Sequence, residues 1–294
     1  MSQVQASKNV TKKSASNLAL AFVLLPKHKK EAMCALYAFC REVDDVADSE
    51  EHSVEEKRVE LKRWREDLQR ACQDEEPNIP IVKELKPVIH ECDLPAEHLE
   101  ALIDGMEMDL TKARYDSWDD LANYCYHVAS VVGLLSVKVF GYNHSSLDDY
   151  GYHLGQALQL TNILRDVRVD AEKGRIYLPQ DLLRKHGVSD DDILNYRFTP
   201  DFRAVAKAVA ERARGHYRSA SQYVYPDKRR LLVASEMMAS VYWRILLKIE
   251  KSDYQVLSPK LTKLTKAHKL GILARSAVRY WLNINSSDYG PRQL

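Results

Sequence analysis

Apolar residues recur at helical spacing along most of this chain, whereas the strict alternation typical of strands is nearly absent. Proline and short polar stretches separate the periodic segments and mark helix ends. The pattern predicts an all-α protein with helices over about residues 28–48, 54–73, 80–91, 95–112, 118–140, 147–170, 199–225, 228–252 and 260–283. Without repeats or linker-like segments, we expect a single domain over 1–294, with 1–13 and 286–294 frayed.

The composition is ordinary for a globular protein, with 45% hydrophobic and 29% charged residues. The 43 basic and 42 acidic residues nearly cancel, so no global positive field indicates a nucleic-acid partner. Five cysteines without CxxC spacing argue against a disulfide framework or zinc site and favour a reducing, cytoplasmic location. The longest apolar run, 128–140, is shorter than the roughly 20 residues that span a bilayer.

A first acidic stripe lies in the predicted helix over 28–48. Tyr37, Arg41, Asp44 and Asp48 recur there at spacings of four, three and four, so they share one helix face. Carboxylates one turn apart repel each other unless a cation or solvent screens them, and such a pair suits a hard divalent ion. The same pattern also occurs on solvated helix faces, so this segment alone leaves both interpretations open.

A second stripe lies in the predicted helix over 147–170. Gln159, Asn162, Asp166 and Asp170 follow at spacings of three, four and four, without lysine among them. If the two helices face each other across a cavity, the oxygen ligands would be Asp44, Asp48, Asn162, Asp166 and Asp170, holding Mg²⁺ ions that also bind diphosphate. Arg41 and Arg165 would then contact phosphate oxygens, or alternatively form ion pairs within their helices.

These motifs, with YCYHVAS at 124–130, resemble the squalene/phytoene synthase family over roughly residues 15 to 270. The two aspartate-rich motifs of that family correspond to DDVAD at 44–48 and NILRD at 162–166, with Asp170 one turn later. The resemblance implies an isoprenoid synthase-type helical bundle around a central cavity, with both motifs binding diphosphate through Mg²⁺. It also implies that Tyr124 lies near the reacting carbons and that Tyr37 and Tyr242 line the site.

Among the subgroups of this family, the amino-acid sequence of these segments is most similar to that of the bacterial presqualene diphosphate synthases associated with hopanoid synthesis. This similarity implies condensation of two farnesyl diphosphates to presqualene diphosphate, with release of diphosphate and no need for NADPH. Squalene would then be formed by a downstream enzyme. Two departures from the family pattern occur, namely Asn17-Leu18 in place of a Ser-Phe pair and Val128-Ala129-Ser130 in place of VAG.

Several questions stay open from the sequence. Proton removal could fall to Tyr124 or to released diphosphate, and Arg175 and Tyr177 either close over phosphate or form an ordinary turn. A complete NADPH-dependent squalene synthase, a dehydrosqualene synthase, a phytoene synthase acting on C20 substrates and a non-catalytic scaffold of the same fold remain alternatives. Terpene cyclases and chain-elongating prenyltransferases fit the second motif poorly.

Residues 260–279 carry six basic residues and no acidic one, interleaved with leucines. This composition predicts a basic amphipathic helix that either rests on the inner face of the membrane as a peripheral contact or is simply solvated.

Overall fold

The computed structural model describes residues 6–7, 10, 21–141, 146–223, 231–282, 284 and 287–290. Within these ranges the regular elements are helices, and the only extended pairing is one isolated bridge between Arg114 and Ile176. The prediction of an all-α protein is therefore confirmed. In chain order after a short 3₁₀ turn at Phe22–Leu24, the helices are α3 (Lys27–Asp48), α4 (Val54–Cys72), α5 (Pro80–Glu91), α6 (Ala96–Thr111), α7 (Trp118–Cys125), α8 (Val131–Val139), α9 (Ser146–Glu172), α10 (Gln180–Lys185), α11 (Asp190–Leu194), α12 (Pro200–Gln222), α13 (Val233–Lys251) and α14 (Lys266–Trp281).

Local sequence signals explain many of the helix ends. Ser53 and Glu56 form a capping box at the start of α4, and Ser117 and Thr199 accept bonds from first-turn N–H groups of α7 and α12. Pro80 lies in the first turn of α5, where its missing N–H has no intrahelical partner to lose. The predicted bounds agree with those of α5 and differ by one residue for α3 and α4.

Two predicted helices differ from the structure in an informative way. The segment 118–140 is interrupted by a π-helical turn at Tyr126–Ser130, between α7 and α8. The segment 260–283 becomes helical only at α14, because the Thr265 hydroxyl caps its first turn by accepting the His268 N–H. Lys260 and Lys263 therefore precede the helix, which corrects the predicted basic helix.

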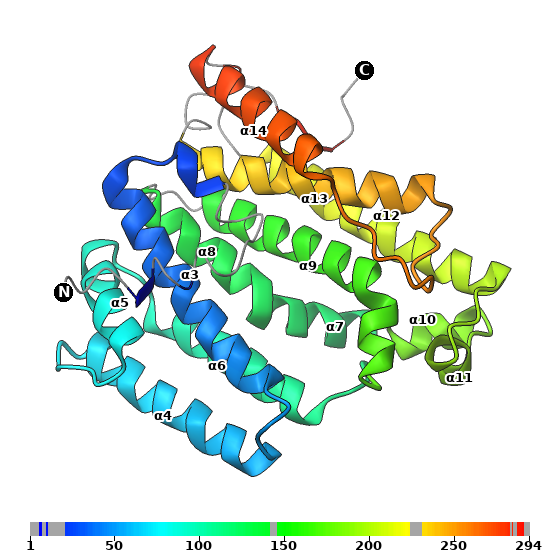
Figure 1. Ribbon diagram of the computed structural model, residues 1–294, viewed down its shortest axis with the longest axis horizontal. Helices are drawn as coiled ribbons and strands as arrows, with labels where there is room; N and C mark the ends of the chain where they lie inside the picture. The colour runs from blue at the N-terminus through cyan, green and yellow to red at the C-terminus, as the bar shows by residue number, and fades with distance from the viewer. Residues whose placement is uncertain are drawn as a thin grey trace.

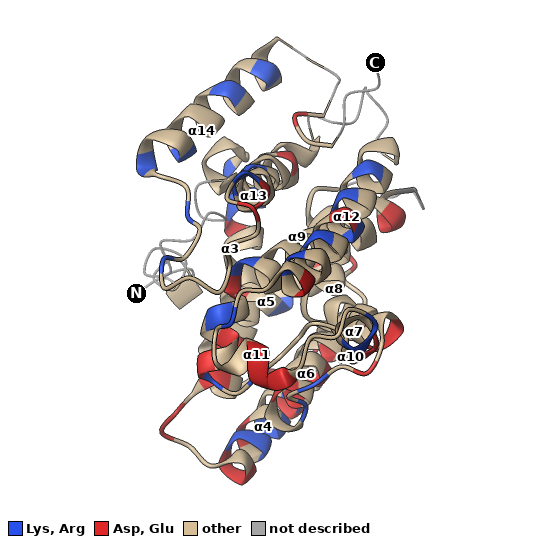
Figure 2. Cartoon of the chain, turned by 90° about the vertical axis from the view of Figure 1, so that its right-hand side faces the viewer, with Lys and Arg blue, Asp and Glu red and all other residues tan. Residues whose placement is uncertain are grey.

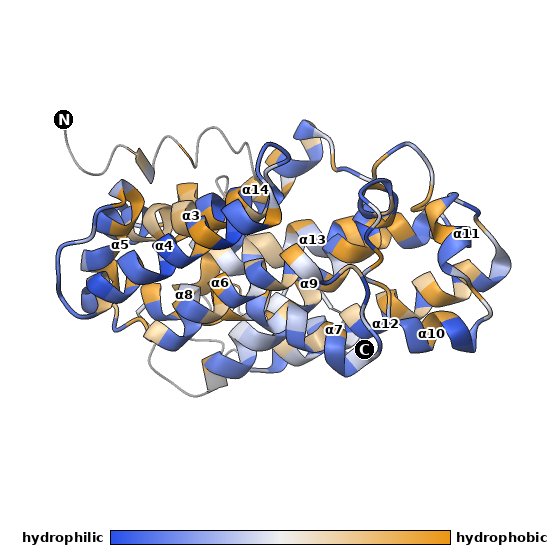
Figure 3. Ribbon diagram, turned by 90° about the horizontal axis from the view of Figure 1, so that it is seen from below, coloured by the Kyte–Doolittle hydropathy of each residue, from blue (hydrophilic) through white to orange (hydrophobic). Residues whose placement is uncertain are grey.

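The longest helix, α9, runs through the middle of the molecule (Figure 1). It packs against α12, α8 and α13, whereas α3 packs against α5, α6 and α8. Hydrophobic and hydrophilic segments alternate along the helices (Figure 3), and the buried apolar residues form one cluster extending from Ala21 to Tyr289. Because α3 and α9 belong to this one cluster, their polar stripes are held in a fixed relation.

A close backbone contact joins α8 to α9. A Cβ placed on Gly133 would lie 2.3 Å from the Gly151 carbonyl oxygen, and one placed on Gly155 would lie 2.5 Å from the Ser130 Cα. No side chain fits at these separations, so the glycines are required by packing rather than by backbone conformation. The contact places the π-helical turn directly against α9.

The predicted fraying of the C-terminus does not hold for residues 287–290. Asp288 pairs with Arg244 at 2.9 Å and with Arg275 at 2.8 Å, which ties this segment to α13 and α14. The Tyr289 ring is buried, and its hydroxyl donates to Glu236. None of the helices in the described part of the chain has both the length and the apolar character needed to cross a membrane.

The contact between α8 and α9 leads to a stability prediction. Gly133→Ala should lower the free energy of unfolding by about 3 kcal/mol, because the new methyl group meets backbone that cannot rotate away. Gly215→Ala on α12 is the control, since a Cβ there meets only the end of Arg218, and it should stabilise by up to about 1 kcal/mol. Urea denaturation measures both, and equal stability of the two variants would contradict the packing argument.

Candidate active site

The predicted site residues converge on one cavity of about 530 Å³. Its walls come from α3, α6, α7, α8, α9, α13, the π-helical turn and the segment after α9. The volume lies within the range of about 300–1,000 Å³ usual for small-molecule sites. All of the predicted site residues line it, namely Tyr37, Arg41, Asp44, Asp48, Tyr124, Gln159, Asn162, Arg165, Asp166, Asp170 and Tyr242.

Within the stripe on α3, Arg41 is paired with neighbouring aspartates. Its guanidinium group donates to Asp44 Oδ2 at 2.7 Å and also pairs with Asp45. Burial raises the pKa of Asp44 to about 6, Arg41 opposes this rise, and Asp48 adds to it. Asp44 is therefore still mostly ionised at pH 7, but it takes up a proton at a clearly higher pH than an ordinary aspartate does.

The stripe on α9 has a similar arrangement. Arg165 forms two parallel bonds to Asp166, with Nε–Oδ1 at 2.8 Å and Nη2–Oδ2 at 2.5 Å, and its guanidinium lies over the Tyr242 ring. Burial raises the pKa of Asp170 to about 7, the Asp166 carboxylate adds to the rise, and nearby cations oppose it. In both stripes, the arginines predicted to contact phosphate are paired with carboxylates predicted to bind metal.

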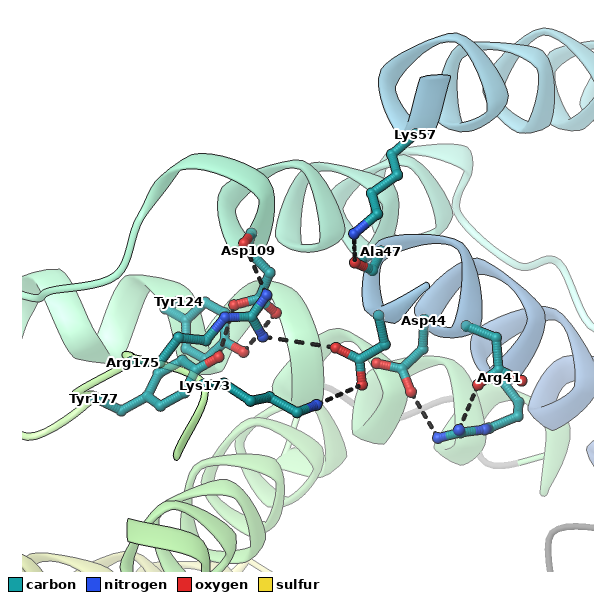
Figure 4. A network of polar contacts seen from close by, with 11 residues as sticks. Arg41, Asp44, Ala47, Lys57, Asp109, Tyr124, Lys173, Arg175 and Tyr177 are labelled. Atoms are coloured by element: carbon teal, nitrogen blue, oxygen red, sulfur yellow. Dashed lines mark hydrogen bonds and ion pairs between the residues drawn. The ribbon is translucent and has the colours of Figure 1, made fainter. Parts of the chain in front are cut away.

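The turn after α9 connects the two stripes. Gly174 adopts the left-handed conformation, with φ of 73°, and the chain then pairs with the segment after α6 through the Ile176 N–H bond to Ala113 O, at 3.0 Å. This path brings Lys173 to 3.9 Å and Arg175 to 3.6 Å from the Asp48 carboxylate. Figure 4 shows both cations reaching from this turn toward α3.

Asp109 on α6 is a site residue that sequence reasoning missed. It accepts hydrogen bonds from the Tyr124 hydroxyl at 2.8 Å and the Tyr177 hydroxyl at 2.9 Å (Figure 4). Burial raises its pKa despite these two bonds. A signal was present, because Asp109 continues the apolar stripe of Leu102 and Met106, where a carboxylate would have no reason to lie in a simple core helix.

Three tyrosine rings pack against one another beside Asp109. The centroids of Tyr115, Tyr124 and Tyr177 lie 5.1 to 5.5 Å apart in pairs. Burial, followed by the Asp109 charge, raises the pKa of Tyr124 well above its ordinary value. Tyr124 therefore holds its proton at neutral pH and donates it in a hydrogen bond.

The rest of the cavity wall is largely apolar. From the segment 128–140, Ala129, Val132 and Gly133 line the cavity. Leu134, which follows them, is buried elsewhere in the fold. Further apolar lining comes from Phe22, Met33, Leu102, Met106, Val128, Phe140, Leu154, Leu158, Ile163, Ala234 and Met238.

The donor set fits a hard cation shared with a ligand. Among the described residues, no group of three or more His, Cys, Asp or Glu side chains forms a ready-made metal site. However, oxygen donors dominate the polar end of the cavity, and Asn162 Oδ1 is buried there without a hydrogen-bond partner. Hard divalent cations commonly use one or two carboxylates together with phosphate oxygens from the substrate, which this arrangement would allow.

Comparison with known proteins identifies the family. The squalene/phytoene synthase model matches residues 11–268. The chain is 37% identical to the presqualene diphosphate synthase of Rhodopseudomonas palustris, covering 90% of this chain and 93% of the relative. It is 38% identical to that of Zymomonas mobilis, covering 92% and 91%. Its structure resembles the squalene synthase HpnC of Alicyclobacillus acidocaldarius, with a TM-score of 0.77 and 28% identity over 86% of this chain and 94% of that one.

The chain belongs to the squalene/phytoene synthase family. It is accordingly a prenyltransferase, of a family that generally acts on diphosphate substrates and depends on a metal ion. The predicted family and enzyme class are confirmed.

One departure from the squalene/phytoene synthase pattern has a structural explanation. Ser130, in place of the last residue of VAG, is buried, and its hydroxyl donates to Tyr152 O at 3.1 Å and accepts from Gln156 Nε2 at 3.2 Å. Because its polar atom is satisfied and Gly155 leaves room for its backbone, serine fits here. The other departure, Asn17-Leu18, lies outside the described residues.

The raised pKa of Asp170 predicts pH-dependent binding of a divalent cation with inorganic diphosphate. The carboxyl must lose its proton to bind a cation, so affinity should fall as pH drops from 8 to 6, by up to about tenfold per unit below pH 7. Diphosphate itself also titrates, so the readout is the difference in slope between wild type and Asp170→Asn. Calorimetric titrations giving equal slopes would show that Asp170 is not linked to binding.

Proposed function

We propose that this protein condenses two molecules of farnesyl diphosphate to presqualene diphosphate in a Mg²⁺-dependent reaction that releases diphosphate and a proton. The observation that carries the proposal is the cavity, which combines an apolar wall with facing acidic stripes from α3 and α9. The two relatives named presqualene diphosphate synthase, each matched over about nine-tenths of both chains, support this substrate and product. The product suits hopanoid synthesis in the cytoplasm, with squalene formed by a downstream enzyme.

The Mg²⁺ ligands in this proposal are Asp44, Asp48, Asn162, Asp166 and Asp170. Their support is the oxygen-only donor set, the raised pKa values of Asp44 and Asp170, and the unpartnered Asn162 oxygen. When bound, Mg²⁺ would offset negative charge on the departing diphosphate. It would also relieve repulsion among carboxylates that are now neutralised only by arginine and lysine.

The two arginines would contact phosphate in the substrate complex. Arg41 and Arg165 are now paired with Asp44 and Asp166, and their guanidinium groups would be available to phosphate oxygens if those carboxylates held the cation. Arg175, on the turn after α9, lies next to Asp48 of α3 and adds a further phosphate contact from the opposite wall. The remaining predicted contacts, Tyr37, Gln159 and Tyr242, position the substrate along the wall between the two stripes.

Tyr124 acts as a neutral group beside the reacting carbons. Its O–H is donated to Asp109 and its pKa is strongly raised, so the departing proton goes to released diphosphate rather than to Tyr124. The Tyr124 and Tyr177 rings, which pack at a tilt and line the cavity, instead offer π-electron density to an allylic cation. The apolar wall excludes the water that would quench this cation.

A product assay separates this proposal from its alternatives. Purified protein is incubated with farnesyl diphosphate and Mg²⁺, with and without NADPH, and the products are identified by mass spectrometry before and after dephosphorylation. Presqualene diphosphate in both samples is expected. Squalene formed only with NADPH would instead indicate a complete squalene synthase, dehydrosqualene would indicate a dehydrosqualene synthase, and turnover restricted to C20 substrate would indicate a phytoene synthase.

Aspartates inside and outside the cavity provide a matched test of the cation site. Asp44→Asn and Asp166→Asn should each lower kcat by at least about a hundredfold, because each removes a charged ligand from the cavity. Asp104→Asn is the control, since Asp104 pairs with Arg65 and does not line the cavity, and it should stay within a few fold of wild type. Circular dichroism and melting temperature verify folding, and full activity of Asp44→Asn and Asp166→Asn would favour a different cation site.

A further inference from the structure

Helix α14 exposes a continuous apolar face. With 100° per residue, Ala267, Leu270, Ala274, Val278 and Trp281 fall within about a third of the helix circumference, and Leu282 extends the row. This row, here called the α14 stripe, is open to solvent, with Leu270 exposed by 59%, Val278 by 54%, Trp281 by 86% and Leu282 by 67%. No hydrogen-bonding side chain interrupts it apart from the Trp281 indole.

Exposed apolar side chains are concentrated in this region. Of the eleven large hydrophobic residues exposed in the described part of the chain, five lie between Leu270 and Ile284. Helix α14 cannot rotate about its axis to bury these side chains, because contacts on its other side fix its orientation. Ile272 is buried on the opposite face, Leu273 and Tyr280 pack against the core, and Arg275 pairs with Asp288. The α14 stripe is therefore held outward by contacts on the other side of the helix.

Basic residues dominate the charge around the stripe, although one of them, Arg275, is paired with Asp288. Between Pro259 and Ser287 the sequence contains six basic residues and no acidic residue, whereas the whole chain is nearly neutral. Figure 2 shows basic residues along α14 with no acidic residue among them. By helical spacing, Lys266 and Arg275 border the two sides of the stripe, and Lys263 precedes the helix on an exposed segment.

We propose that the α14 stripe docks onto the surface of an anionic lipid bilayer. An uninterrupted apolar face bordered by Lys and Arg is the arrangement of an interfacial helix, with the apolar side among acyl chains and the basic side against acidic headgroups. Tryptophan at the end of the stripe suits this boundary, because its ring is apolar while its indole N–H can meet the headgroup layer. A protein partner would be expected to meet more polar groups across such an area.

Docking would bring one wall of the cavity close to the membrane. Helix α14 packs on α13, and α13 lines the cavity with Ala234, Met238 and Tyr242. If the proposed function holds, a lipophilic diphosphate is then released near the phase in which it dissolves. The docking itself rests on the surface of α14 and not on the reaction.

Vesicle binding tests the proposal with the full chain and without substrate. The protein is co-sedimented with phosphatidylcholine vesicles that contain or lack phosphatidylglycerol, at low and high salt. We expect binding to the anionic vesicles, weakened by salt, and much less binding to the neutral ones. Failure to bind the anionic vesicles, or equal binding to both kinds, would overturn the proposal.

Three variants separate the contributions. Trp281→Ser/Leu282→Ser removes the most exposed part of the α14 stripe, and Lys263→Glu/Lys266→Glu reverses two charges beside it. Each should reduce the partition coefficient by at least about tenfold. Val59→Ser is the control, because Val59 is also highly exposed but lies on α4, and it should bind like wild type. Wild-type binding by Trp281→Ser/Leu282→Ser would show that the α14 stripe does not cause vesicle binding. Wild-type binding by Lys263→Glu/Lys266→Glu would show the same for the basic charges.

Two further measurements test whether self-association or a loss of activity explains the results. Sedimentation velocity without vesicles measures self-association, and a concentration-dependent dimer lost in Trp281→Ser/Leu282→Ser would assign the stripe to a second copy of the chain and overturn the lipid proposal. Turnover of farnesyl diphosphate in vesicle-free buffer should be unchanged in that variant. Because vesicle binding is measured without substrate, absence of turnover in wild type would count against the proposed function alone.

Discussion

Carboxylates from three helices share one partly buried cavity, and their mutual repulsion is the constraint around which the site is organised. Asp44, Asp109 and Asp170 come from α3, α6 and α9, and burial raises the pKa of each. Arginine, lysine and tyrosine donors supply compensation in the structure described here. In the proposed function, cations and a diphosphate take over this compensation from the arginines that are now paired with Asp44 and Asp166.

The scaffold holds these charges in place through backbone contact as much as through side chains. Glycines bring α8 and the π-helical turn against α9, and Val128, Ala129 and Val132 from this segment line the cavity. The left-handed turn at Gly174 brings Arg175 back toward Asp48.

Polar and apolar surfaces are divided between two regions of the molecule. The acidic stripes line the cavity, whose wall is otherwise largely apolar. Helix α14 has the reverse arrangement, since its apolar face points outward and basic residues border it. Helix α13 connects the two regions, because it lines the cavity and supports α14.

Much of the fold and of the candidate site could be predicted from the sequence, because helical spacing is a local property. The positions of α3, α5 and α9 follow from periodicity, and a spacing of four residues places Asp44 beside Asp48 and Asn162 beside Asp166. Only the tertiary structure decided which stripes meet, that Asp109 joins them, and that the residues after Gly174 enter the cavity. It also decided which face of α14 is exposed, because burial depends on α13 and Asp288, whose contacts are distant in sequence and leave no periodic signal.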